Sequence, residues 1–165
     1  MSNTLVQAIV IGAALTASAI DLRTRRVPNV LTMSVALVGL GLAAIGMGRV
    51  GIVASAVGCL IGLAMMLPGY LIGATGGGDV KLMAAIGTLL GPAATFRAFV
   101  ATAVAGGLIA AVIALRRGRM TATLAETGAF VMSAGSNIGE IRAQSDNRFA
   151  YAPAIAIGVI VASFT

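Results

Sequence analysis

The stretch Thr75-Gly76-Gly77-Gly78-Asp79-Val80-Lys81 places a carboxylate and an ammonium group between two apolar runs. Three consecutive glycines weaken a helix, because each loses more backbone entropy than other residues and has no side chain to pack. They do let another backbone approach closely. The stretch therefore predicts a break between membrane segments that presents Asp79 at the water boundary.

The composition is that of a membrane protein. Hydrophobic residues make up 59% of the 165 residues, charged residues 10%, and the mean hydropathy is +1.03. A soluble domain of this length could not cover so much apolar surface. The apolar runs are continuous and do not alternate every second residue, which favours helices over a barrel. The lone cysteine, Cys59, is expected to fill the core.

We therefore predict an all-α, polytopic membrane protein, a single domain over residues 1–165 with about six transmembrane helices of about 20 residues each. The predicted spans are 5–20, 30–47, 52–73, 80–90, 98–115 and 150–164. The fourth is short for a full crossing, so it is expected to be extended, tilted or sunk among its neighbours. Residues 116–148 mix charged and amide side chains and are predicted to form a polar cytoplasmic loop, with or without a short interfacial helix.

Basic side chains fall mainly on one predicted face of the membrane. The connections after the first, third and fifth spans hold nine of them, against two on the other face: Arg23, Arg25, Arg26, Lys81, Arg116, Arg117, Arg119, Arg142 and Arg148 against Arg49 and Arg97. This bias predicts an amino terminus outside and the nine-charge face in the cytoplasm. Because the clusters flank apolar runs, contact with anionic head groups explains the net charge of +6 better than nucleic-acid binding does.

Asp21 and Asp79 are both predicted to lie on this cytoplasmic face. Asp79 alone could cap the following helix by accepting a backbone hydrogen bond. Asp21 lies at the carboxyl end of the first helix, where the helix dipole disfavours negative charge, although the nearby arginines could compensate. Two such acids on one face favour a functional role over two unrelated structural roles.

Paired carboxylates suit amide hydrolysis. Two close carboxylates cannot both ionise cheaply, so they share a proton; the charged one can then accept a proton from water while the neutral one donates to the amide. The chain has no histidine to act as the base of a serine or cysteine triad. The sequence therefore predicts a membrane-embedded aspartic peptidase with no metal and no cofactor.

Two stretches resemble the signature stretches of the type IV prepilin peptidases. Residues 21–29 are Asp-Leu-Arg-Thr-Arg-Arg-Val-Pro-Asn, residues 76–81 fit that family's GxGD motif, and residues 151–158 are similar to its closing segment. The resemblance implies an aspartic endopeptidase of the prokaryotic cytoplasmic membrane that removes the short basic leader from pilin or pseudopilin precursors. Cleavage is expected after a glycine, at the cytoplasmic face.

The resemblance also assigns positions. Asp21 and Asp79 match the catalytic pair. Gly76 and Gly78 match the motif glycines, which give the chain room to bend and a substrate backbone room to approach. Three further residues fall on motif positions near the substrate: Pro28, Asn29 and Lys81. Lys81 could tune Asp79 electrostatically or extend to the interface.

One departure from the longer family members is informative. Those members carry a cytosolic region with paired cysteines and methylate the new amino terminus, whereas this chain begins at its first span and has one cysteine. No methyltransferase activity is therefore expected, and the compact form resembles the peptidases of tight-adherence (Flp) pilus systems, with archaeal preflagellin peptidases as relatives. The alternative is a small proton-coupled carrier or a pilus-assembly scaffold. The expected partners are a prepilin substrate and the lipid bilayer, without nucleic acid.

Overall fold

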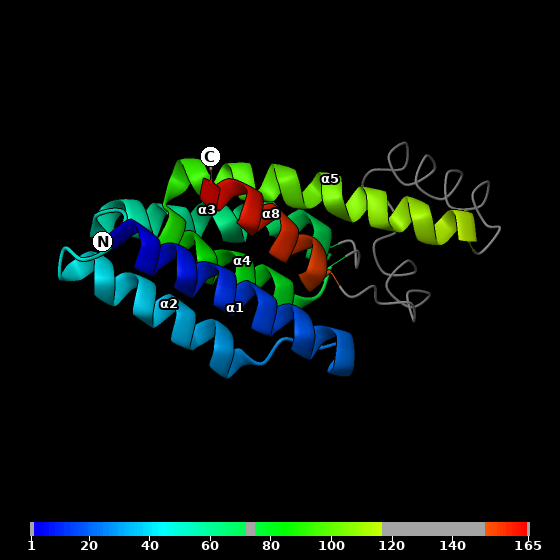
Figure 1. The fold of residues 1–165 in the computed structure, drawn as a ribbon, viewed down its shortest axis with the longest axis horizontal. Helices are drawn as coiled ribbons and strands as arrows, with labels where there is room; N and C mark the ends of the chain where they lie inside the picture. Colours follow the sequence, from blue (N-terminus) through cyan, green and yellow to red (C-terminus); the bar gives the residue numbers. More distant parts are fainter. Residues whose placement is uncertain (1, 72–74, 117–150, 165) are drawn as a thin grey trace.

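The computed structural model shows helices that pack side by side and alternate in direction (Figure 1). It describes residues 2–71, 75–116 and 151–164. The helices are α1 (Ser2–Thr24), α2 (Asn29–Ala44), α3 (Ile52–Leu71), α4 (Gly77–Leu90), α5 (Pro92–Arg116) and α8 (Ala152–Phe164). Their alternation brings the last residues of α1, α3 and α5 and the first residues of α2, α4 and α8 to one end of the bundle, here called the polar end.

The helices confirm the predicted all-α membrane fold. Three of them contain segments long and apolar enough to cross a membrane: Thr4–Thr24, Ile52–Leu71 and Pro92–Val112. The apolar helices α2 and α8 are shorter. Large apolar side chains point outward along the bundle, with Leu37, Leu60 and Leu108 all more than 60% exposed. Such a surface is suited to lipid.

Helix α4 lies at the centre of the bundle. Its 14 residues extend only about 21 Å. All its residues from Asp79 to Leu90 are buried except Lys81, and it packs against each of the other five helices described. Of the three possibilities predicted for the short fourth span, the structure therefore shows a helix sunk among its neighbours.

Small residues allow α3 to approach α4 closely. Gly58 lies against the backbone of Gly87, and a Cβ atom added to Gly62 would lie 2.6 Å from the carbonyl oxygen of Met83. The Ser55 hydroxyl donates a hydrogen bond of 2.7 Å to the carbonyl of Thr88. Close backbone packing of this kind replaces the hydrophobic effect as the attraction between helices in lipid.

Several helix boundaries differ from the prediction. Helix α1 continues to Thr24, so Asp21 lies within its last turn. Helix α4 begins at Gly77, so Gly77 and Gly78 belong to its first turn and do not form a break. The Asp79 and Val80 amides donate to the Gly76 carbonyl, and these bonds start the helix in spite of the glycines.

The remaining differences occur at proline and at the ends of the runs. Helix α5 begins at Pro92, six residues before the predicted start at 98, because proline is well suited to the first position of a helix. Helix α2 covers Asn29–Ala44 and ends before the predicted 47, since Ile45 terminates it. The predicted polar loop at 116–148 lies outside the described residues, apart from Arg116.

The packing of α3 on α4 predicts a difference between two glycines. A Gly58→Ala variant places a methyl group into the Gly87 backbone, whereas Gly41→Ala on α2 meets nothing within 4 Å. We expect Gly58→Ala to lower the free energy of unfolding by about 1–3 kcal/mol, and Gly41→Ala to leave it unchanged or raise it by up to about 1 kcal/mol. Thermal unfolding in detergent compares the two variants, and equal stability would contradict the packing described.

Candidate active site

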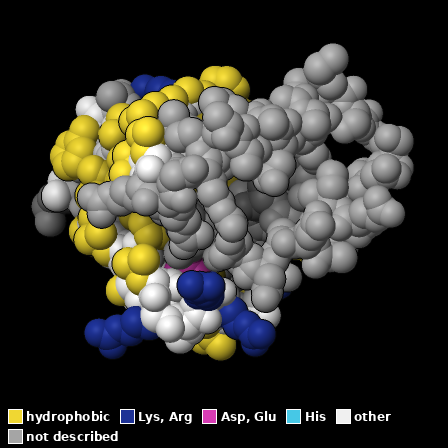
Figure 2. Space-filling view, turned by 90° about the vertical axis from the view of Figure 1, so that its right-hand side faces the viewer, with side chains coloured by type: hydrophobic (Ala, Val, Ile, Leu, Met, Phe, Trp, Pro, Cys, Tyr) yellow, Lys and Arg dark blue, Asp and Glu magenta, His cyan; other side chains and the backbone are white. Residues whose placement is uncertain are grey.

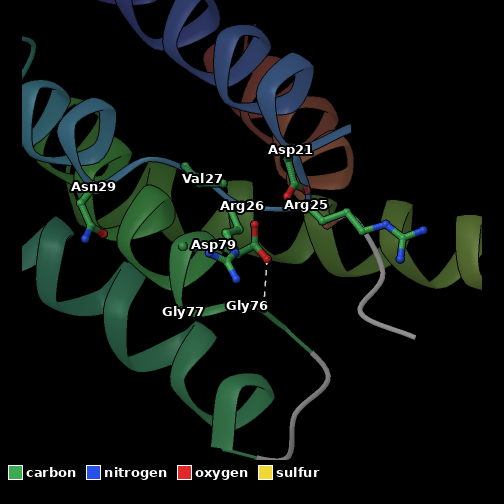
Figure 3. A pocket seen from close by; sticks show the side chains of 9 residues that line it. Asp21, Arg25, Arg26, Val27, Asn29, Gly76, Gly77 and Asp79 are labelled. Carbon is green, nitrogen blue, oxygen red and sulfur yellow. Dashed lines mark hydrogen bonds between the residues drawn. The ribbon is translucent and has the colours of Figure 1, made fainter. Parts of the chain in front are cut away.

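A cavity of about 260 Å³ opens at the polar end, between the α1–α2 connection and the start of α4 (Figure 3). Figure 2 views the molecule from this end and shows a small patch of acidic surface with basic side chains next to it and below it. The residues that line the cavity are Asp21, Arg25, Arg26, Val27, Asn29, Gly76, Gly77, Gly78 and Asp79. Two segments far apart in the sequence, residues 21–29 and 76–79, thus form one site.

The structure brings together most of the residues singled out from the sequence. Asp21, Asp79, Gly76, Gly78 and Asn29 all line the cavity. Pro28 and Lys81 do not line it.

Those two residues instead support the site from outside. Pro28 is the N-cap residue of α2. The Lys81 ammonium group donates a hydrogen bond of 3.0 Å to Oδ1 of Asn29. This bond joins the first turn of α4 to the start of α2, a contact that neither predicted role of Lys81 included.

The Asp79 carboxylate has two unlike oxygens. Its Oδ2 accepts a hydrogen bond of 3.0 Å from the Gly76 amide, so the capping role considered from the sequence is present. Its Oδ1 is buried and has no hydrogen-bond partner among the described residues. Asp79 as a whole is only 4% exposed. An unpartnered buried oxygen is costly in a purely structural residue, so capping alone does not explain Asp79.

The environment of Asp79 favours its protonated form. The residue lies in the first turn of α4, before the apolar run and outside the candidate membrane-crossing segments. Burial raises the pKa of Asp79 from 3.8 to about 6; the Gly76 hydrogen bond lowers the pKa in part, and the negative charge of Asp21 raises it further. Near neutral pH this carboxyl is therefore close to the point where it exchanges a proton.

Asp21 is held by a helix that follows it by more than a hundred residues. Its Oδ2 accepts a hydrogen bond of 3.3 Å from the Ala152 amide, at the start of α8, and Asp21 is 5% exposed. The amino end of α8 carries partial positive charge, which offsets the unfavourable position of Asp21 at the carboxyl end of α1. From the sequence, the nearby arginines could have compensated for this charge; the Ala152 amide was not foreseen.

Among the described residues, neither Arg25 nor Arg26 forms an ion pair with the two acids of the cavity. Arg25 and Arg26 line the cavity but are exposed, and in Figure 3 the Arg25 side chain extends away from the carboxylates. Arg25 has a φ of 52°, in the left-handed region, and its amide donates to the Asp21 carbonyl at 2.7 Å to close α1. Glycine usually occupies such a position, so arginine here is strained.

Within residues 2–71, 75–116 and 151–164, no three His, Cys, Asp or Glu side chains come together as metal ligands would. The cavity therefore offers a pair of carboxyl groups, backbone amides of a glycine-rich turn and two guanidinium groups. Such an arrangement can bind an extended peptide and exchange protons with it or with water.

Fold and site together define a helical membrane protein with two buried carboxyl groups in one cavity. The model of the type IV leader peptidase family matches residues 8–111, more than half of the chain and a range that includes Asp21 and Asp79. The chain belongs to this family, as its resemblance to the prepilin peptidases predicted. Searches of curated proteins and of solved structures give no match.

Because Asp79 is buried, replacing it with a neutral residue should raise the free energy of unfolding, by an amount that depends on pH. Because the folded protein raises the pKa of Asp79 from 3.8 to about 6, the folded state binds the proton more tightly than the unfolded state does. Folding stability is therefore lost as the pH rises from 3.8 to about 6. Asp79→Asn keeps an acceptor for the Gly76 amide and removes this penalty. We expect it to stabilise the protein at pH 7.5 by up to about 3 kcal/mol, and to have little effect near pH 4.

Thermal unfolding of the wild-type protein and the Asp79→Asn variant at both pH values measures this difference. A variant as stable as the wild type at pH 7.5 would show that Asp79 ionises in the folded state without cost.

Proposed function

We propose that this leader peptidase is an aspartic endopeptidase in which Asp21 and Asp79 together activate water. The substrate class is a type IV or Flp prepilin or pseudopilin, a chain with a basic leader, a glycine and then an apolar helix, cut after the glycine. The observation that carries the proposal is that two acids from α1 and α4, both nearly inaccessible to solvent, line one cavity.

The environments of the two acids support different roles. The Asp79 carboxyl, with its raised pKa and unpartnered Oδ1, serves as the proton donor. Each acid accepts a backbone N–H bond, but the negative charge of Asp21 helps to raise the pKa of Asp79, so Asp21 is the charged member of the pair and serves as the base. Such separation of two neighbouring acids is the arrangement that acid–base catalysis of amide hydrolysis requires.

The proposed reaction returns both acids to their starting states. Asp21 takes a proton from water while the water oxygen bonds to the scissile carbonyl carbon, and Asp79 gives its proton to the carbonyl oxygen. The C–N bond then breaks: the nitrogen leaves with the proton held by Asp21, and a hydroxyl of the adduct returns a proton to Asp79. The products are a carboxylic acid at the end of the leader and a free amine on the mature pilin.

Basic side chains support a cytoplasmic position for the cavity. The polar end carries Arg23, Arg25, Arg26 and Lys81, whereas Arg49 precedes α3 and Arg97 lies near the start of α5, which are the ends of these helices opposite the polar end. By the positive-inside tendency, the cavity faces the cytoplasm in a multi-pass protein of the prokaryotic inner membrane, and the amino terminus lies outside. A carrier is less suited to this geometry, because carriers place ionisable groups near the middle of the membrane.

If Asp21 and Asp79 act together as a catalytic pair, here called the dyad, each aspartate is essential for cleavage. Asp21→Asn and Asp79→Asn, co-expressed singly with a candidate prepilin, should each reduce leader removal by about 10⁴-fold or more, because neither amide can take the place of its acid in proton transfer. Cleavage is followed by the mobility shift of the pilin on a gel.

Two controls separate chemistry from folding. Cys59→Ser removes the only thiol of the chain and should retain cleavage, since Cys59 does not line the cavity. Each Asn variant should remain in the membrane fraction at wild-type amounts. Retained cleavage in either Asn variant would overturn the dyad, and loss of cleavage in Cys59→Ser would point to thiol chemistry.

A further inference from the structure

We propose that Tyr151 is a positioning residue for Asp21: its ring, seated on Gly106 of α5, sets the start of α8 so that the Ala152 amide holds the Asp21 carboxylate at the cavity. The inference rests on the proposed function, because it concerns how one of the two acids is aimed. Tyr151 and Ala152 lie beyond the range 8–111 that the family model matches. They follow the residues 117–150 that the structure does not describe.

The first link is the bond between α8 and Asp21. Ala152 is the first residue of α8 and is fully buried. Its amide is one of those at a helix start that have no partner within the helix, and it donates to Oδ2 of Asp21 at 3.3 Å. The carboxylate position therefore depends on where α8 begins.

The second link is the contact between Tyr151 and α5. A Cβ atom added to Gly106 would lie 2.7 Å from the Tyr151 hydroxyl oxygen and 2.8 Å from Cε2 and Cζ. The tyrosine ring thus occupies the space that any larger residue at 106 would need. The next residue, Gly107, has nothing within 4 Å of the same added atom. The requirement for glycine is confined to the position that faces Tyr151.

A third observation places Tyr151 near the other acid. Burial raises the pKa of Tyr151, and the negative charge of Asp79 raises it further. The Tyr151 hydroxyl is therefore within range of the charge of Asp79. The next residue, Ala152, donates its hydrogen bond to Asp21. Because the Tyr151 carbonyl also accepts the amides of Ala154 and Ile155, a shift of Tyr151 moves the whole first turn of α8.

The Ala152 amide can be removed without breaking α8. Proline suits the first position of a helix, where it lacks only an amide that the helix does not use. Ala152→Pro therefore deletes the donor to Asp21, and Ala152→Gly keeps it. Relative to Ala152→Gly, we expect Ala152→Pro to lower kcat by at least about tenfold with KM changed less than about twofold.

The pH profile gives a readout that a purely structural effect would not move. Without its amide donor the charged form of the Asp21 carboxylate is disfavoured, so the acidic limb of the rate profile should move to higher pH in Ala152→Pro. Equal kcat and an equal profile in the proline and glycine variants would overturn the role of the amide.

A second pair of variants tests the role of Tyr151 by altering Gly106, the residue of α5 that its ring contacts. Gly106→Ala should push the ring and lower kcat by about tenfold, whereas Gly107→Ala should cleave like the wild type. In a Tyr151→Ala background the Gly106→Ala substitution should cost nothing further, because the ring that it displaces is gone. A Gly106→Ala loss that persists in that background, or no loss at all, would overturn the role of Tyr151.

The two proposals fail in distinguishable ways. Cleavage by Asp21→Asn would overturn the dyad itself. An inactive Asp21→Asn together with fully active Ala152→Pro and Gly106→Ala variants would overturn only the positioning by α8. The thermal midpoint of every variant is measured alongside its activity, and the double-substituted protein keeps the test decisive if the proline variant does not fold.

Discussion

Asp21 and Asp79 each accept a hydrogen bond from a backbone amide, and the positions of their carboxyl groups at the cavity depend on these two bonds. Burying a carboxylate in an apolar bundle is costly unless a donor or a counter-charge accompanies it. Here the donors are the Gly76 amide for Asp79 and the Ala152 amide for Asp21. An arginine paired with either carboxylate would stabilise its charged form, but Arg25 and Arg26 are exposed at the rim of the cavity. The amides provide enough support for burial and leave the protons exchangeable.

Several glycines are explained by the central position of α4. A short helix surrounded on all sides can be enclosed only if its neighbours approach closely, as Gly58 and Gly62 of α3 do. The same need exists at the start of α4, where a Cβ atom added to Gly78 would lie 2.9 Å from Cβ of Val27. Glycine there lets the α1–α2 connection lie directly on the first turn of α4, and the bond between Lys81 and Asn29 secures it. Close packing thus brings the segment of Asp21 to that of Asp79.

The sequence predicted the parts of this protein that depend on composition and local motifs. Continuous apolar runs gave the helical membrane fold, and the unusual placement of Asp21 and Asp79 identified the pair that lines the cavity. The helix boundaries were less predictable, because hydrogen bonds to Gly76 extend α4 back through glycines that disfavour helix. The Ala152 amide could not have been predicted: it is a backbone group, 131 residues from Asp21, and only the packing of α8 on α1 brings the two together. The bond from Lys81 to Asn29 also depends on packing, here of α4 beside the start of α2, and neither role considered for Lys81, tuning Asp79 or extending to the interface, included it.

Cross-linking of paired cysteines tests whether residues 21 and 79 face each other across one cavity. In a Cys59→Ser background, Asp21→Cys combined with Asp79→Cys is treated in native membranes with a short reagent that joins two thiols. The matched control combines Asp21→Cys with Arg49→Cys, because residue 49 lies between the end of α2 and the start of α3, away from the polar end. We expect an intramolecular cross-link between 21 and 79 and none between 21 and 49. No link between 21 and 79, although each thiol reacts singly with a one-armed reagent, would contradict this expectation.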